Sequence, residues 1–281
     1  MPRETMMPAM GSIATARGRI GYLERGGGEG ESQHRLGNGA LSPSPIVFLH
    51  GVGSDKRVWT PQLDHFGRSR WAVAFDYPGY GESEYLDGAT REDFAAAIFA
   101  AMDALEIEAA HVCGLSLGGV IAIAMHSAAP ERCASLIIAD SFAVHPDGQA
   151  IHDRSVAASR SMSMRDLAEA RAAVLLGSAA TPELLADVVE TMSRIDPAAY
   201  QLGAAAVWLA DQRDRVAAID VPTLILVGDE DSITPPALSE ELHELIPGSR
   251  LERIAAAGHL ANIEQPQAFN RAIESFLSGQ R

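Results

Sequence analysis

The 281-residue chain has only two cysteines, Cys113 and Cys133, and a single lysine, Lys56. No Cys-x-x-Cys spacing occurs, so neither a zinc site nor a redox pair is indicated. Cys113 lies in an apolar stretch, where a cysteine packs as a small hydrophobic side chain. We therefore expect a cytoplasmic protein without disulfides. The scarcity of lysine, in a chain whose other basic residues are arginines, is attributed to genome composition rather than to function.

Positive charge is scarce as well, since Lys and Arg together number 22 against 37 Asp and Glu, a net charge of −15. An acidic chain repels phosphate backbones, so we expect neither nucleic acid nor an anionic membrane surface as a partner. Residues 1–20 lack the apolar core of a signal peptide. The uncharged stretch 112–130 contains three glycines and ends in a proline, which favours a strand, a turn and a buried helix over a membrane span.

Large apolar residues are few in residues 25–45, which are rich in glycine, serine and proline. The segment has neither a Gly-x-Gly-x-x-Gly nor a Walker spacing, and no helical pattern follows it. We therefore predict a surface loop rather than a phosphate-binding cradle.

Continuous apolar segments alternate with amphipathic patterns along the rest of the chain. After a hairpin around Arg17-Gly18, we predict buried strands within 45–51, 71–83, 110–116, 133–140, 222–231 and 249–259, and helices within 91–107, 117–130, 235–246 and 266–277. This alternation predicts an α/β fold with a mostly parallel sheet covered by helices on both faces.

The alternation is interrupted between about Ser141 and Ala218, where the pattern is helical and no strand is evident. We predict a core domain formed by residues 1–140 and 219–281, with residues 141–218 as a helical lid over the carboxyl ends of the strands. Sites in parallel sheets form at those strand ends, and an insertion there would enclose one.

The clearest motif is HVCGLSLGGV, residues 111–120, in which Ser116 lies between Gly114 and Gly118 at a junction from strand to helix. This is the nucleophile elbow, Gly-x-Ser-x-Gly. The chain reverses within a few residues, which holds the serine in a strained conformation with its hydroxyl exposed. Side chains at 114 and 118 would collide with neighbouring backbone, so both positions require glycine.

A serine hydroxyl needs a base to remove its proton and a carboxylate to orient that base. Of the nine histidines, His259 follows an acid-bearing strand end and lies after the last predicted strand. His50 precedes the serine and is expected to shape the turn beside the oxyanion site, whereas His126 and His243 are expected to be neither catalytic nor metal ligands. The acid is Asp229, Glu230, Asp231 or Asp140, and spacing alone leaves the four open.

An oxyanion hole requires two backbone N–H groups, of which one belongs to the residue after the nucleophile, Leu117. The other should come from the loop after strand 45–51, where Val52 is best placed. Trp208, in the predicted lid, is a candidate wall of the substrate pocket, although packing within the lid would explain it equally well.

Five stretches in this order resemble the α/β-hydrolase superfamily: FLHGVG, DYPGYGES, GLSLG, GDEDSITP and AGHLANIEQP. The resemblance implies a Ser-His-Asp triad without a cofactor or a metal, and it favours Asp231 as the acid. Within the superfamily, the chain most resembles the 3-oxoadipate enol-lactonases, which hydrolyse an enol-lactone in aromatic catabolism. It implies a small-molecule ester or lactone substrate, and we expect a monomer or homodimer.

An enol-lactone of this kind carries a carboxylate, which would favour an arginine partner. The candidates in the predicted lid are Arg154, Arg160, Arg165, Arg171 and Arg194. Three alternative functions share the same motifs: a C–C bond hydrolase of ring-cleavage dienones, a cofactor-free haloperoxidase or perhydrolase, and a ligand-binding protein without turnover. Haloalkane dehalogenases and epoxide hydrolases are disfavoured, because they have aspartate at the position of Ser116.

Overall fold

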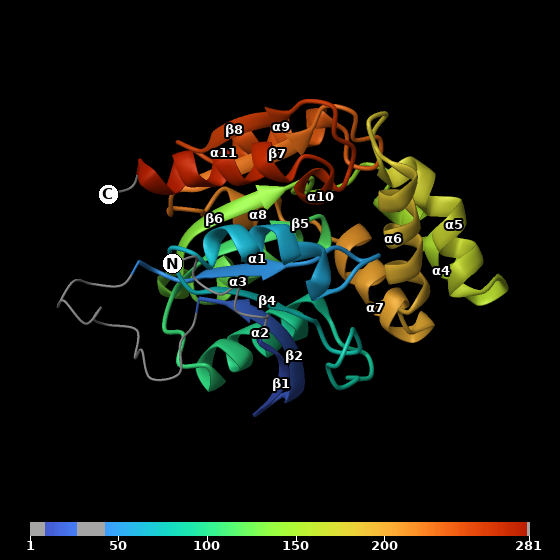
Figure 1. Cartoon of the computed structure of the whole chain (residues 1–281), viewed down its shortest axis with the longest axis horizontal. Helices are drawn as coiled ribbons and strands as arrows, with labels where there is room; N and C mark the ends of the chain where they lie inside the picture. Colours follow the sequence, from blue (N-terminus) through green and yellow to red (C-terminus); the bar gives the residue numbers. More distant parts are fainter. Residues whose placement is uncertain (1–8, 27–42, 280–281) are drawn as a thin grey trace, which may run out of the picture.

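In the computed structural model, which describes residues 9–26 and 43–279, one sheet of eight strands forms the centre of the molecule (Figure 1). Its order is β1-β2-β4-β3-β5-β6-β7-β8. The strands are β1 (Ala9–Thr15), β2 (Gly18–Arg25), β3 (Ile46–Leu49), β4 (Ala72–Phe75), β5 (Ala110–Leu115), β6 (Cys133–Ala139), β7 (Thr223–Gly228) and β8 (Arg250–Ile254). The hairpin of β1 and β2 pairs antiparallel with β4, and all later neighbours pair parallel. The predicted α/β fold is therefore confirmed.

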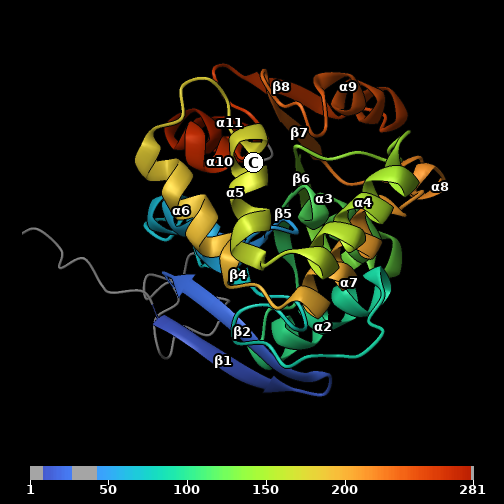
Figure 2. The same ribbon diagram turned by 90° about the vertical axis from the view of Figure 1, so that its right-hand side faces the viewer.

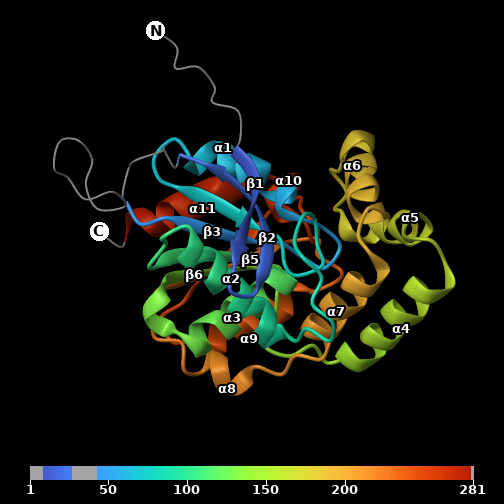
Figure 3. The same cartoon turned by 90° about the horizontal axis from the view of Figure 1, so that it is seen from below.

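Helices cover both faces of the sheet, which is why β3, β4 and β7 are buried along their whole length. In Figure 3, α1 (Thr60–Phe66) and α11 (Pro266–Ser278) lie on one face, and α2 (Arg91–Ala104), α3 (Leu117–Ala128) and α9 (Pro236–Leu245) lie on the other. Within the described residues, no helix combines the length and the apolar character needed to cross a membrane.

Between β6 and β7 the structure has five helices: α4 (Gly148–Ser161), α5 (Met164–Leu175), α6 (Pro182–Ser193), α7 (Pro197–Trp208) and α8 (Arg213–Val216). Helix α5 pairs with α6 and α4 pairs with α7, and together they lie in front of the strand ends (Figure 2). Side chains of Ser163, Thr181 and Asp196 accept hydrogen bonds from the first turns of α5, α6 and α7. Whether this segment acts as a lid remains a prediction of the sequence.

Three details differ from the sequence prediction or lie beyond it. The final strand was expected over 249–259 but ends at Ile254, because the backbone of Ala256 has a left-handed φ of 54° that stops the extended conformation. The short 3₁₀ helix Lys56–Trp59 and helix α1 after it were not predicted. The predicted loop 25–45 lies largely outside the described residues.

Candidate active site

Ser116 lies between the end of β5 and the first residue of α3, with a φ of 56° and a ψ of −114°. Its N–H donates to the Ala139 carbonyl of the neighbouring strand, and its own carbonyl accepts from the Gly119 N–H and from Ser141 Oγ. These hydrogen bonds hold a backbone conformation that is otherwise rare for a residue other than glycine. Such strain at a strand-to-helix turn is typical of a functional site.

Two glycines allow this turn. A Cβ at Gly114 would lie 2.0 Å from the carbonyl oxygen of Gly118, and a Cβ at Gly118 would lie 2.0 Å from the carbonyl oxygen of Leu49. Both contacts involve backbone atoms, which cannot move aside without displacing β3 or α3. The sequence argument for glycine at these two positions therefore has a direct steric basis.

Replacement of Gly114 by alanine is expected to lower the free energy of unfolding by about 3 kcal/mol or more, because the added methyl group overlaps a fixed carbonyl. Urea unfolding followed by circular dichroism measures this change. Gly279→Ala is the matched control, since a Cβ there meets only ordinary contacts at 3.6 Å or beyond. Equal stability of Gly114→Ala and the unaltered protein would contradict the steric argument.

The side chains of Ser116, His259 and Asp231 form a continuous hydrogen-bonded chain. His259 Nε2 lies 2.9 Å from Ser116 Oγ, and His259 Nδ1 lies 2.9 Å from Asp231 Oδ2. All three residues are buried, with at most 5% of each exposed. They lie far apart in the sequence and meet at the carboxyl ends of β5, β7 and β8, where the strand pattern places a site.

Asp231 is fixed by several donors besides His259. Its Oδ1 accepts from the backbone N–H groups of Ile233 and Thr234, and its Oδ2 accepts from Thr234 Oγ1 at 2.6 Å. Burial alone would raise the pKa of the Asp231 carboxyl, but the His259 imidazole and the Thr234 hydrogen bonds outweigh it and lower the pKa. The carboxylate is therefore ionised and positioned to orient an imidazole.

The other three acid candidates have different partners. Asp229 pairs with Arg253 Nε at 2.5 Å, and Glu230 accepts from the N–H and hydroxyl of Ser178. Asp140, at the end of β6, accepts from the Gly228 N–H at 2.8 Å. Burial and the nearby negative charge of Asp231 raise the pKa of Asp140 well above its ordinary value. In the described part of the chain, none of the three hydrogen-bonds to His259.

The two predicted oxyanion donors flank the serine. Leu117 is the first residue of α3, where a backbone N–H has no acceptor within the helix. Val52 follows Gly51. A Cβ added to Gly51 would lie 3.5 Å from the Cβ of Ser116, so this turn passes close to the nucleophile elbow. Among the described residues, the N–H of Val52 donates no hydrogen bond. Both amides are available to a ligand.

A cavity of about 380 Å³ opens at this point and is lined by Ser116, His259 and Val52 together with residues of α5, α6 and α7. Trp208 forms part of its wall; it is 2% exposed and stacks on Phe142 at a centroid distance of 5.8 Å. Trp208 is thus both a pocket residue and a packed aromatic residue, the two interpretations that the sequence left open. Arg171 and Trp208 also border a second cavity of about 330 Å³.

The helical segment contacts the loop that carries His259 directly. The backbone N–H of His259 donates to the carbonyl of Leu175, the last residue of α5, at 2.8 Å. On the other side, the Glu264 carboxylate accepts from the N–H groups of Gly177, Gly258 and Leu260. The loop that carries His259 is therefore fixed at both ends.

Several of these residues were not identified from the sequence. Thr234 and Glu264 act through hydrogen bonds whose partners no spacing rule predicts. Lys56 is buried between the carboxylates of Asp76 and Glu82. The only indication of its importance in the sequence was that it is the single lysine.

Two other histidines lie away from this site: His126 contacts Asp220, and His243 contacts Ser249. Among the described residues, no group of three or more His, Cys, Asp or Glu side chains is arranged to hold a metal ion.

Comparisons with known proteins agree with the sequence resemblance. The family profile described as "alpha/beta hydrolase fold" matches residues 44–266. The 3-oxoadipate enol-lactonase 1 of Acinetobacter baylyi is 28% identical over 242 residues, which cover 85% of this chain and 91% of that protein. A pimeloyl-acyl-carrier protein methyl ester esterase of Neisseria meningitidis is also 28% identical, over 83% of this chain and 93% of its own length.

Among solved structures, the enol-lactonase of Burkholderia xenovorans superposes with a TM-score of 0.86 at 26% identity. The match covers 95% of this chain and 100% of that structure. Fold and sequence therefore point to the same group of proteins.

Proposed function

This chain belongs to the α/β hydrolase fold family, and on that premise we propose that it hydrolyses carboxylic esters or lactones with Ser116 as the nucleophile, His259 as the base and Asp231 as the acid. The observation that carries the proposal is the chain of two 2.9 Å hydrogen bonds from Ser116 Oγ through His259 to Asp231. This is the arrangement that activates a serine in acyl transfer.

In the proposed reaction, Ser116 Oγ attacks the ester carbonyl while His259 Nε2 takes its proton. The resulting oxyanion accepts hydrogen bonds from the N–H groups of Val52 and Leu117. The intermediate then collapses, the alkoxide leaves with the proton from His259, and an acyl group remains on Ser116. A water molecule, deprotonated by His259, then attacks the acyl carbonyl. The bond from the acyl carbon to Ser116 Oγ breaks, Oγ takes back the proton from His259, and the carboxylic acid is released. Asp231 stays ionised throughout and stabilises the imidazolium.

For the substrate we propose an ester or lactone that carries a carboxylate, such as a 3-oxoadipate enol-lactone. Two relatives named as enol-lactonases support this class. Of the five arginines considered from the sequence, Arg171 and Arg194 line the cavity that contains Ser116, and Arg194 pairs with Glu190 at 3.0 Å. Within the described residues, Arg171 makes no ion pair or hydrogen bond, so its guanidinium is available to an anionic group.

Helices α4 to α7 would then act as a lid that determines which substrates enter. They supply Arg171 and Trp208 to the cavity wall, and substrate selection by such an insertion needs no change in the triad. This role would also explain why the segment contacts the loop of His259.

The test is a panel of a p-nitrophenyl ester, a neutral lactone, a carboxylate-bearing enol-lactone and a ring-cleavage dienone. The proposal predicts turnover of the esters and lactones, with the highest kcat/KM for the carboxylate-bearing lactone. Preferential cleavage of the dienone would indicate a C–C hydrolase, and peroxide-dependent bromination would indicate a haloperoxidase. A fluorophosphonate that labels Ser116, without turnover of any substrate, would favour a binding protein.

Arg171→Met is expected to reduce kcat/KM for the carboxylate-bearing lactone about 10- to 100-fold, mainly through KM, because a charge-assisted contact with the substrate is lost. Hydrolysis of p-nitrophenyl acetate, which has no carboxylate, should be unchanged. Arg165→Met is the matched control, since Arg165 pairs with Glu190 at 2.6 Å and is not among the residues lining the cavity. An equal loss with both substrates would rule out a specific role for Arg171 in binding the carboxylate.

A further inference from the structure

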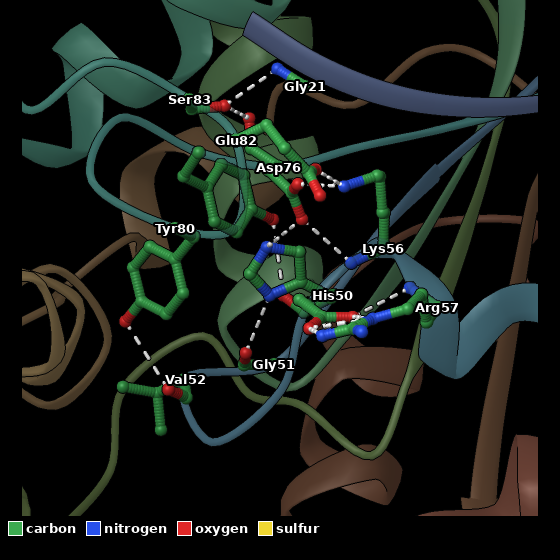
Figure 4. Close-up of polar contacts among 12 residues, drawn as sticks. Gly21, His50, Gly51, Val52, Lys56, Arg57, Asp76, Tyr80, Glu82 and Ser83 are labelled. Carbon is green, nitrogen blue, oxygen red and sulfur yellow. Dashed lines mark hydrogen bonds and ion pairs between the residues drawn. The ribbon is translucent and has the colours of Figure 1, made fainter. Parts of the chain in front are cut away.

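The turn that follows β3 comprises residues 50–55 and includes Val52. Lys56, the single lysine of the chain, is buried directly after this turn. Its ammonium group donates to Asp76 Oδ2 at 2.6 Å and also contacts the Glu82 carboxylate. Its backbone N–H donates to the other oxygen of the same side chain, Asp76 Oδ1, at 2.8 Å. Figure 4 shows this cluster beside the turn that carries Val52. Asp76 therefore holds Lys56 at two points, through the main chain and the side chain.

A buried ion pair adds little stability, because both charges lose their hydration. Asp76 is fully buried, and burial raises its pKa to about 6 although the Lys56 ammonium opposes the shift. The space around this carboxylate is too small for an added methyl group, since a Cβ at Gly81 would lie 2.0 Å from Asp76 Oδ2. The cluster is better explained by the geometry that it fixes than by the stability that it adds.

Asp76 lies against His50, the residue that begins the turn. Asp76 Oδ1 is 3.8 Å from His50 Nε2. The other ring nitrogen, Nδ1, is 2.8 Å from the Gly51 carbonyl oxygen. A carbonyl oxygen can only accept, so in this hydrogen bond Nδ1 carries the proton. Burial lowers the pKa of His50 to about 4, which leaves the ring neutral near pH 7.

The Gly51 carbonyl and the Val52 N–H belong to one peptide group. Because that group is planar and trans, the two bonds point in opposite directions, and a fixed carbonyl fixes the direction of the N–H. The Ser54 N–H is a second donor to the same carbonyl, at 3.2 Å. The ring of His50 therefore helps to aim the Val52 N–H.

The adjacent peptide groups are held from the same side. Tyr77 Oη donates to the His50 carbonyl at 3.2 Å, and Tyr80 Oη donates to the Val52 carbonyl at 3.3 Å. Both tyrosines belong to the segment after β4 that also contains Asp76. Figure 4 shows Tyr80 and Asp76 approaching the turn from this segment.

We propose that Lys56 is a positioning residue for the reaction: by anchoring Asp76, and with it the segment that carries Tyr77 and Tyr80, against the turn, it sets the direction of the Val52 N–H toward the oxyanion. The inference rests on the proposed function, in which Val52 stabilises that oxyanion. Lys56 itself lies outside the set of residues that line the cavity. It acts through Asp76 and through the Tyr77 and Tyr80 hydroxyls, which hold the peptide groups on either side of the one that carries the Val52 N–H.

The principal variant is Lys56→Met combined with Asp76→Asn, which removes both charges and so avoids an unpaired buried carboxylate; Lys56→Met alone is measured beside it. In the double variant we expect kcat for a p-nitrophenyl ester to fall about 10- to 100-fold with little change in KM, because a displaced donor affects the transition state rather than substrate binding. Affinity for a trifluoromethyl ketone, whose adduct with Ser116 carries an oxyanion, should weaken in proportion to kcat/KM. Arg132→Met is the matched control, since it removes a partly buried cation that is paired with Asp103 and lies outside the set of residues lining the cavity.

A second readout does not depend on turnover. In protein labelled with ¹⁵N-valine, the amide signal of Val52, assigned by its loss in Val52→Ile, should shift or broaden in the double variant and not in Arg132→Met. An unchanged Val52 signal together with unchanged kcat would overturn the proposal. If the unaltered protein hydrolyses no ester, the proposed function fails, while the Val52 signal still decides whether Lys56 positions this amide.

Discussion

Ser116→Ala is expected to reduce kcat for a p-nitrophenyl ester by about 10⁶-fold. The reason is that no other group can form the acyl intermediate, since the hydroxyl oxygen is the atom that His259 Nε2 contacts at 2.9 Å. The fold should be retained, because the hydrogen bonds that maintain the elbow involve the main chain of Ser116, which alanine preserves.

Burst kinetics with the p-nitrophenyl ester, together with urea unfolding, measure both parts of this expectation. Ser127→Ala is a suitable control, since Ser127 is an exposed serine in the last turn of the same helix. Residual activity near that of the unaltered protein would remove Ser116 from the mechanism. A large loss of stability would show instead that the hydroxyl is needed for the fold.

Asp231→Asn is expected to lower kcat by about 10⁴-fold with little change in KM. An asparagine side chain can present its amide NH₂ to His259 Nδ1. That nitrogen must then be the acceptor, the proton moves to Nε2, and Nε2 can no longer take a proton from Ser116. The hydrogen bonds that Asp231 Oδ1 receives from Ile233 and Thr234 can persist, so the loop should remain folded.

Asp140→Asn provides the matched comparison, because Asp140 is a second buried carboxyl at a strand end beside the same site. It accepts from Gly228 and, among the described residues, has no hydrogen bond to His259, so kcat should change little. Steady-state kinetics of the two variants at the same pH decide between the acids. If Asp140→Asn shows the larger loss, the assignment of Asp231 is wrong.

The sheet was predictable because parallel strands buried on both faces leave continuous apolar segments, as in IVFL of β3 and TLILVG of β7. The position of Ser116 was predictable for a different reason. Its backbone conformation requires glycine at positions 114 and 118, and these two glycines can be read directly from the sequence. The end of β8 was not predictable, because the apolar letters AAA continue after Ile254 while the backbone turns at Ala256.

Residues that act through long-range contacts were harder to identify. The choice among four acids and five arginines depends on which side chains already have partners, and spacing carries no such information. Arg171 and Arg194 have the same chemistry, and only the Glu190 carboxylate beside Arg194 distinguishes them. The scarcity of lysine was attributed to genome composition, and the role of Lys56 was missed because its contact with Asp76 joins two loops that follow different strands.

The hydrogen bond from the His259 N–H to the Leu175 carbonyl links the end of α5 to the backbone of the proposed base. A displacement of that helix end, whether by a bulky substrate or by a mutation in α5, would be transmitted to the imidazole. Substrates that fit the helical segment poorly would then react slowly even when they bind. Discrimination between substrates would in that case appear in the rate of acylation as well as in affinity.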